Sequence, residues 1–234
     1  MAKKTLLENL KQVKKNIKTS AKNANRDYEE IKLIAVSKNQ GLEDIKTLNK
    51  AGIKFFGENR VQELQEKDEN LKSENITLDW HFIGHLQRNK VKYLMRMENC
   101  QMIESIDSLR LAKEVNKRAG KNNRIIPVLI EINVEGDENK FGITPDKAEN
   151  FLNKVKNFDN LKIEGLMTVL PYLDNSDKLR SYFKDMKSLF DHLSKEVCPL
   201  KELSMGMSND YQIAVEEGAT IVRVGTAIFG EREY

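Results

Sequence analysis

Cysteine, proline and tryptophan are scarce in this sequence, and long apolar runs are absent. The 234 residues include two cysteines, four prolines, one tryptophan and three histidines. Cys100 and Cys198 form no CxxC pair and lie near no histidine at ligand spacing, so they are interpreted as free thiols in a reducing cytoplasm. The same spacing gives no support for a metal site. No apolar stretch approaches the ~20 residues that cross a bilayer, so a membrane-spanning protein is not expected.

An excess of one charge is also absent. The 39 basic residues nearly balance 36 acidic residues, giving a net charge of +3, and the two signs are interspersed. Without a concentrated basic field, nucleic acid is not predicted as a partner. The hydrophobic fraction of 39% indicates a soluble, folded chain that is long enough for one large domain spanning residues 1–234.

A leading helix is predicted over about residues 3–25. Its apolar residues recur at helical spacing: Leu6, Leu7, Leu10, Val13 and Ile17. The segment has no small-residue cleavage site and no apolar core run, so it is not interpreted as a signal peptide. A helix lying on a membrane surface is the alternative, although Glu8 dilutes its basic face.

After residue 30, short β-rich runs alternate with amphipathic stretches. The predicted strands are 32–37, 53–57, 79–84, 101–105, 126–134, 162–169, 202–205 and 220–224. Helices are predicted at 42–51, 59–69 and 89–97, after a cap at Asp107, from Thr144-Pro145, at 177–195 and at 209–217. Eight such units predict an α/β fold, a single (β/α)8 TIM barrel over about 31–230. An open doubly wound sheet is the alternative, but no GxGxxG turn follows the first strand.

Lys38 directly follows the first predicted strand, at the barrel end where functional groups gather. Burying an ammonium costs several kcal/mol unless it is paired or neutralised, so a lysine in this position is unusual. A desolvated lysine amine can attack an aldehyde and form a Schiff base. The alternative is a solvated surface lysine at the start of a loop.

Small residues follow the last two predicted strands. Residues 204–208 read SMGMS and residues 223–226 read RVGT, each leading into a predicted helix. Exposed backbone N–H groups, helix N-termini and hydroxyls make anion sites, and barrels often bind phosphate after strands seven and eight. Simple turn geometry is the alternative for either glycine. Because strand one neighbours strand eight in a closed barrel, Lys38 and these turns could hold opposite ends of one small molecule.

Seven segments carry a family resemblance in order along nearly the whole chain. They are LIAVSK (33–38), FGENRVQE (56–63), WHFIGHLQRNK (80–90), NVEGDENKFG (133–142), GLMT (165–168), LSMGMSND (203–210) and VRVGTAIFGER (222–232). On these motifs the chain resembles the YggS/PROSC family of pyridoxal phosphate homeostasis proteins, which share a fold-type III barrel with the N-terminal domain of alanine racemase. The resemblance implies pyridoxal 5′-phosphate (PLP) as the cofactor and Lys38 as the Schiff-base residue. It further implies that Ser208, Gly225 and Thr226 hold the phosphate and that Arg223 faces the pyridine nitrogen.

Arg223 has a chemical consequence of its own. A guanidinium has only donors and stays charged, so it favours an unprotonated pyridine nitrogen and weakens carbanion stabilisation. A structural ion pair is the alternative. Asn59 ends the second strand and is a further candidate for cofactor contact, with turn capping as its alternative. His85, Gln87 and Lys140 follow strands three and five and are candidates for the barrel mouth.

These observations favour a non-catalytic PLP carrier in intracellular vitamin B6 homeostasis, with no catalytic residue. A small PLP-dependent amino-acid racemase is the alternative, and a Schiff-base aldolase acting on a sugar phosphate is a third. Two-base racemisation needs a second acid/base, which alanine racemase takes from a second domain, and the sequence ends soon after the eighth predicted strand. PLP and PLP-requiring apo-enzymes are the expected partners of a cytoplasmic monomer.

Overall fold

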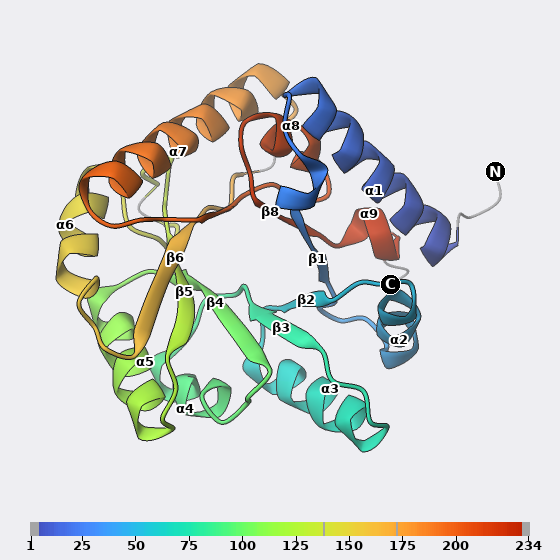
Figure 1. The fold of residues 1–234 in the computed structure, drawn as a ribbon, viewed down its shortest axis with the longest axis horizontal. Coiled ribbons are helices and arrows are strands. Elements are labelled where there is room, and N and C mark those ends of the chain that lie inside the picture. Colours follow the sequence, from blue (N-terminus) through green and yellow to red (C-terminus); the bar gives the residue numbers. More distant parts are fainter. Residues whose placement is uncertain (1–4, 138, 172, 231–234) are drawn as a thin grey trace.

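Eight parallel strands form a closed barrel in the computed structural model, which describes residues 5–137, 139–171 and 173–230 (Figure 1). The strands are β1 (Lys32–Val36), β2 (Phe55–Glu58), β3 (Asp79–Phe82), β4 (Cys100–Ile106), β5 (Ile126–Glu131), β6 (Leu161–Met167), β7 (Glu202–Ser204) and β8 (Ile221–Val224). Neighbours in sequence are neighbours in the barrel, and β8 closes onto β1 with Ile34 opposite Arg223. The predicted barrel is therefore confirmed, and the open doubly wound sheet is excluded.

Helices surround the barrel and connect successive strands (Figure 1). They are α1 (Leu6–Asn23), α2 (Leu42–Lys50), α3 (Val61–Ser73), α4 (Val91–Leu94), α5 (Leu109–Lys121), α6 (Pro145–Val155), α7 (Ser176–Glu196), α8 (Tyr211–Glu216) and α9 (Thr226–Phe229), with 3-10 turns η1 (Tyr28–Glu30) and η2 (Arg88–Lys90). The start of α6 is as predicted, because Thr144 is its N-cap and Pro145 its first residue.

The leading helix α1 lies alongside α8 and α9 (Figure 1). The side chain of Thr5 caps its first turn, so the helix begins at Leu6, and positions 3 and 4 of the predicted helix lie outside the described residues. Leu10, Val13 and Ile17 are buried in the main hydrophobic core. Most of the apolar face of α1 therefore packs on the barrel, whereas Leu7 is 48% exposed.

The predicted cap of α5 is wrong by one residue. Ser108, not Asp107, is the N-cap, and its hydroxyl accepts a hydrogen bond from the Leu111 amide at 3.3 Å. The Asp107 carboxylate instead lies 2.9 Å from Nδ1 of His85. Serine and aspartate both favour the N-cap position, so the local sequence does not distinguish them. The contact of Asp107 with His85 engages its carboxylate, and Ser108 caps the helix.

Several strand boundaries also differ from the prediction, among them the start of β2 and the end of β5. The amide of Ile53 donates to Leu48 and closes the end of α2, so β2 begins later, at Phe55. β5 ends at Glu131 and not at 134, because the side chain of Asn133 accepts from the Gly136 amide and turns the chain. Local polar contacts thus shorten runs whose composition suits a strand.

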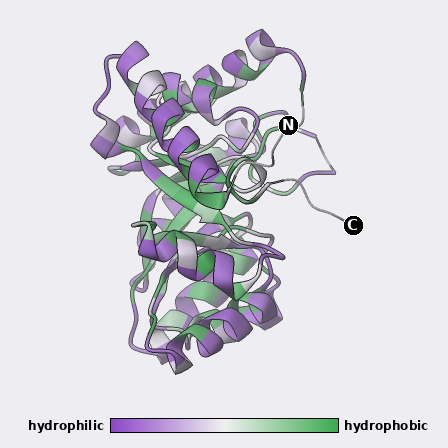
Figure 2. Cartoon of the chain, turned by 90° about the vertical axis from the view of Figure 1, so that its right-hand side faces the viewer, coloured by the Kyte–Doolittle hydropathy of each residue, from purple (hydrophilic) through white to green (hydrophobic). Residues whose placement is uncertain are grey.

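The core has two parts, inside and outside the barrel wall. A small apolar cluster fills the middle of the barrel: Ile34, Met102, Leu129, Met167 and Ile221. A larger cluster packs the outward faces of the strands against the helices, whose outer surfaces are hydrophilic (Figure 2). Met167 and Cys100 are buried, as the sequence predicts. The apolar cluster closes the barrel below its mouth, where the polar residues gather.

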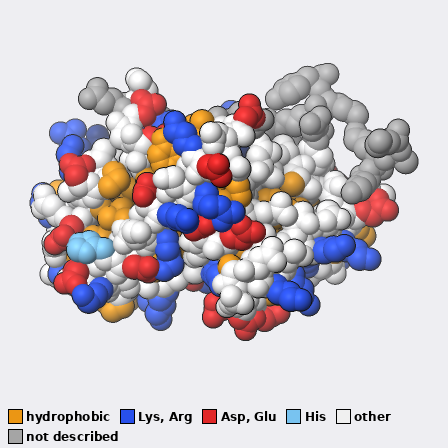
Figure 3. Space-filling model, turned by 90° about the horizontal axis from the view of Figure 1, so that it is seen from above, with side chains coloured by type: hydrophobic (Ala, Val, Ile, Leu, Met, Phe, Trp, Pro, Cys, Tyr) orange, Lys and Arg blue, Asp and Glu red, His pale blue; other side chains and the backbone are white. Residues whose placement is uncertain are grey.

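Basic and acidic side chains alternate over the face drawn in Figure 3, with only small apolar patches between them. This arrangement agrees with the near-balance of charge in the sequence. Among the helices of the described residues, none combines the length and apolarity required to cross a membrane.

Candidate functional site

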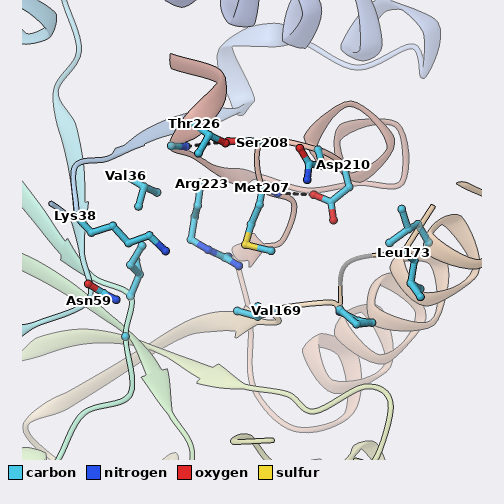
Figure 4. A pocket seen from close by; sticks show the side chains of 16 residues that line it. Val36, Lys38, Asn59, Val169, Leu173, Met207, Ser208, Asp210, Arg223 and Thr226 are labelled. Carbon is cyan, nitrogen blue, oxygen red and sulfur yellow. Dashed lines mark hydrogen bonds between the residues drawn. The ribbon is translucent and has the colours of Figure 1, made fainter. Parts of the chain in front are cut away.

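A cavity of about 380 Å³ opens at the carboxyl ends of the strands (Figure 4). This volume falls within the usual range for small-molecule sites. Its lining includes all six residues predicted to bind the cofactor: Lys38, Asn59, Ser208, Arg223, Gly225 and Thr226. They follow or end β1, β2, β7 and β8, so the closure of the barrel brings together residues nearly 190 positions apart in the sequence.

The Lys38 side chain extends into the cavity from the β1 side (Figure 4). Within residues 5–137, 139–171 and 173–230, no carboxylate pairs with its amine. Other lysines near the barrel are paired, such as Lys32 with Glu202 and Lys140 with Glu135. Lys38 is therefore a half-buried amine available to a ligand in the cavity.

The turns after β7 and β8 present backbone N–H groups and hydroxyls to the same cavity. The Ser208 hydroxyl accepts hydrogen bonds from the amides of Gly225 and Ala227, both at 3.1 Å, and so joins the turns after β7 and β8. In the described part of the chain, the amides of Ser208 and Thr226 have no acceptor. Unpaired amides beside hydroxyls form an anion-binding concavity.

A tight turn after β7 sets the position of Ser208. Gly206 has φ +92°, and a Cβ there would lie 2.5 Å from Cβ of Ala214, so only glycine fits. The Asp210 carboxylate accepts from the Met207 amide at 2.6 Å and closes the turn. Burial raises the pKa of Asp210, while this hydrogen bond opposes the rise.

Arg223 lies in the wall between the cavity and the barrel interior, and only 3% of it is exposed. One guanidinium nitrogen donates to the Ser204 hydroxyl at 2.5 Å, and the other donates to the Thr168 carbonyl at 2.7 Å. Burial lowers the pKa of Arg223, and the surrounding carboxylates oppose this effect. A guanidinium nevertheless stays charged in proteins, so Arg223 is a fixed cation beside the cavity.

A buried carboxylate balances Arg223. Glu104 lies 3.8 Å from the guanidinium, accepts from the Ser204 hydroxyl at 2.6 Å and contacts Nδ1 of His81 at 2.6 Å. Burial alone would raise the pKa of Glu104, but His81, Arg223 and Ser204 outweigh it and hold that pKa below its ordinary value. Arg223 is thus both a cavity residue and a member of a structural ion pair.

Glu131, at the end of β5, is a second acidic group near Arg223. Burial raises its pKa to about 7, the charge of Asp107 adds to the rise, and Arg223 opposes it. Its buried Oε2 has no hydrogen-bond partner among the described residues. The carboxyl group is therefore largely protonated at pH values below 7.

Asn59 reaches the cavity because β2 and β3 approach closely. A Cβ on Gly84 would lie 2.3 Å from the Asn59 carbonyl oxygen, so a glycine is required there. His85, Gln87 and Lys140 do not line this cavity. The ring of His85 instead stacks on Phe141 at 3.7 Å.

In the described portion of the chain, no group of three or more His, Cys, Asp or Glu side chains is arranged to hold a metal ion.

The sequence interpretation missed the buried charges behind the cavity. Glu104 contacts His81 and pairs with Arg223, and Glu58 and Lys67 lie behind the first strand. The available signal was an acidic residue inside a β-rich run, as in FFGE at 55–58 and QMIES at 101–105. A charge in such a run needs a buried partner, which the sequence alone does not identify.

The protein is a closed eight-stranded barrel whose mouth brings together an amine that follows the first strand and the polar turns that follow the last two. The model of the family described as "Alanine racemase, N-terminal domain" matches residues 9–233. A pyridoxal phosphate homeostasis protein of Aquifex aeolicus is 46% identical over 228 residues, covering 97% of this chain and 98% of the relative. The chain therefore belongs to the alanine racemase N-terminal domain family, among the pyridoxal phosphate homeostasis proteins. This confirms the resemblance inferred from the motifs.

Other relatives agree with this assignment. The human pyridoxal phosphate homeostasis protein is 40% identical over 213 residues, covering 87% of this chain and 77% of the human protein. PipY of Synechococcus elongatus, in a structure with PLP bound, is 33% identical with a TM-score of 0.81, covering 92% of this chain and 100% of PipY. An alanine racemase of Clostridium difficile has a TM-score of 0.73 at 17% identity, covering 94% of this chain and 60% of the racemase, and it supports the fold alone.

Proposed function

We propose that this protein binds PLP in the cavity at the barrel mouth, through a Schiff base on Lys38, and acts in PLP homeostasis as a carrier. The observation that supports the proposal is that an unpaired amine and a turn with unpaired amides line the same cavity. PLP offers an aldehyde to the first and a phosphate to the second. The names of the relatives and the PLP-bound PipY structure point to the same ligand.

The donor set of the cavity fits the phosphate end of PLP. The unpaired amides of Ser208 and Thr226 and the hydroxyl of Thr226 can donate to phosphate oxygens. The Ser208 hydroxyl holds the Gly225 turn against β7 and so keeps these donors together. Asn59 lines the β2 side, where its amide can contact the ligand.

Arg223 sets the electronic character of the site. Bound PLP supplies an aldehyde and an electron-withdrawing ring. Arg223 can offer only N–H donors to a ring nitrogen, so it favours the unprotonated ring and a weaker electron sink. Among the described residues lining the cavity, the titratable ones are Lys38, Asp210 and Arg223, and Asp210 is engaged by the Met207 amide. These features favour holding PLP over catalysis at the substrate α-carbon.

The test is one absorption spectrum with PLP, recorded for the unmodified protein and for Lys38→Ala. The visible band of a protein-bound Schiff base is expected in the first and not in the second. Lys54→Ala serves as a control, because Lys54 is exposed and lies outside the cavity.

Two results would contradict the carrier function. Amino-acid racemisation at a rate ordinary for an enzyme, lost on Lys38→Ala, would support the racemase instead. A colourless adduct that borohydride traps only with a sugar phosphate would support an aldolase.

A further inference from the structure

Lys38 occupies a turn whose backbone is constrained on both sides. The Gln40 amide donates to the Ser37 carbonyl at 2.9 Å, which closes a four-residue turn around Lys38. The next residue, Asn39, has φ +59°, a left-handed conformation that few residues other than glycine adopt. The direction of the Lys38 side chain therefore depends on whatever holds this turn in place.

Helix α3 contacts the backbone on each side of Lys38. The Lys67 ammonium donates to the Ser37 carbonyl at 2.6 Å, before Lys38. The Glu63 carboxylate accepts from the Asn39 amide at 2.5 Å, after it. Glu63 and Lys67 lie one helical turn apart and pair with each other at 2.7 Å. One ion pair of α3 thus holds both flanks of the Lys38 turn.

A buried carboxylate fixes the inner member of this pair. Glu58, at the end of β2, is fully buried and accepts from Lys67 at 2.8 Å and from the Ser37 hydroxyl at 2.7 Å. Its second oxygen has no partner in the described part of the structure. Glu58 and Lys67 are buried and Glu63 is partly buried, which costs desolvation that simple packing would avoid, so a role in fixing geometry is a reason for the arrangement.

We propose that the Glu63–Lys67 pair is a positioning device that directs the Lys38 amine into the cavity. This inference rests on the proposed function, because it takes Lys38 as the residue that captures PLP. Neither Glu63 nor Lys67 lines the cavity. Their effect on PLP must therefore pass through Lys38 and its turn, in the way that a rigid support preorganises a reacting group.

The experiment is a double-mutant cycle between Glu63→Ala and Lys38→Ala, with PLP binding measured by equilibrium dialysis. Alanine keeps the propensity of α3 while removing the contact with Asn39. With Lys38 present, Glu63→Ala is expected to raise the apparent dissociation constant for PLP about tenfold. In the Lys38→Ala background the same change should alter the constant by less than about twofold, because PLP is then held only at its phosphate end.

Two further variants separate positioning from general stability. Glu63→Gln keeps an oxygen that can accept from Asn39, so it should recover most of the affinity. Lys72→Met removes a pair with Asp68 that has the same spacing on the same helix, at 2.9 Å, but does not reach the Lys38 turn. It should leave PLP binding unchanged.

Three outcomes would overturn the inference. The first is an equal effect of Glu63→Ala in both backgrounds, which indicates a general structural role. The second is no effect in either background, and the third is an effect of Lys72→Met as large as that of Glu63→Ala. These results differ from failure of the proposed function, in which the unmodified protein itself gives no Schiff-base band with PLP.

Discussion

The two sides of the cavity are built in different ways. On the β1 side, a single amine faces the cavity, and the charged groups behind it lie outside the barrel, under α3. On the β8 side, neutral amides and hydroxyls face the cavity, and the charge of Arg223 lies in the cavity wall, where Glu104 balances it.

This difference predicts how PLP binding responds when one group is removed from each side. Covalent capture of PLP depends on one nitrogen atom, so the direction of the Lys38 side chain matters. Ionic contacts from Glu63 and Lys67 to the backbone beside Lys38 fix the turn that sets this direction. Phosphate binding is shared among several donors, so the loss of one leaves the others in place. Four substitutions at and behind the cavity test this contrast, and their expected effects on PLP affinity or on stability decrease in the order given.

The largest effect is expected on the β1 side, from Lys38→Ala. Without the amine no Schiff base can form, and the affinity for PLP should fall by at least about 100-fold, or roughly 3 kcal/mol. Dialysis of the variant against PLP measures this loss. An affinity for PLP within a few-fold of that of the unmodified protein would show that binding on the β1 side does not depend on this single amine.

Arg223→Met tests the internal charge of the β8 side. Its removal takes away the guanidinium that balances Glu104, while His81 and Ser204 still contact this carboxylate, so the free energy of unfolding should fall by about 3 kcal/mol. Urea denaturation measures the change. The double variant with Glu104→Gln should recover part of the loss, and equal destabilisation in both variants would argue against the pairing.

Glu131→Gln tests whether the Glu131 carboxyl group near Arg223 is protonated in the folded protein at pH values below about 7. Burial raises the pKa of Glu131 from 4.5 to about 7 in the folded protein, so the folded state binds more protons than the unfolded state between these values. The stability contribution of Glu131 is therefore greatest at low pH and is lost as the pH rises towards 7. The variant should be more stable than the unmodified protein above pH ~7, by up to about 3 kcal/mol, and similar to it below pH ~4.5. A stability difference that does not change with pH would refute this.

The smallest effect is expected from Ser208→Ala, which removes one bridging hydroxyl on the β8 side. The amides of Gly225 and Ala227 lose their acceptor, and the affinity for PLP should fall about fivefold to tenfold, near 1 kcal/mol. Competition with inorganic phosphate measures the change. Ser73→Ala, at the exposed end of α3, is the matched control. A loss of PLP affinity as large as that of Lys38→Ala would show that the β8 side also depends on a single group.

The barrel could be predicted from sequence because its signals are local and repeated. β-rich runs alternate with amphipathic helices eight times, and strands of a closed barrel end at one mouth. Lys38, Ser208 and Thr226 all follow strand ends, so their gathering at one cavity follows from the topology.

The supports behind the cavity could not be predicted in the same way. The contacts of Glu63 and Lys67 with the Lys38 turn depend on the rotation of α3 against β1 and β2. The choice of Ser108 over Asp107 as a cap likewise depends on His85, which is distant in sequence. Such contacts join residues far apart in the chain, and no local pattern specifies them.

We propose that Lys38 and the turns after β7 and β8 hold opposite ends of one PLP molecule. Borohydride reduction of the PLP-loaded protein, with and without excess inorganic phosphate, tests this when it is followed by mass mapping of the modified peptide. We expect a single phosphopyridoxyl group on Lys38, with less labelling when phosphate competes. Labelling spread over surface lysines would contradict this proposal. So would labelling of Lys38 whose extent is the same with and without excess phosphate.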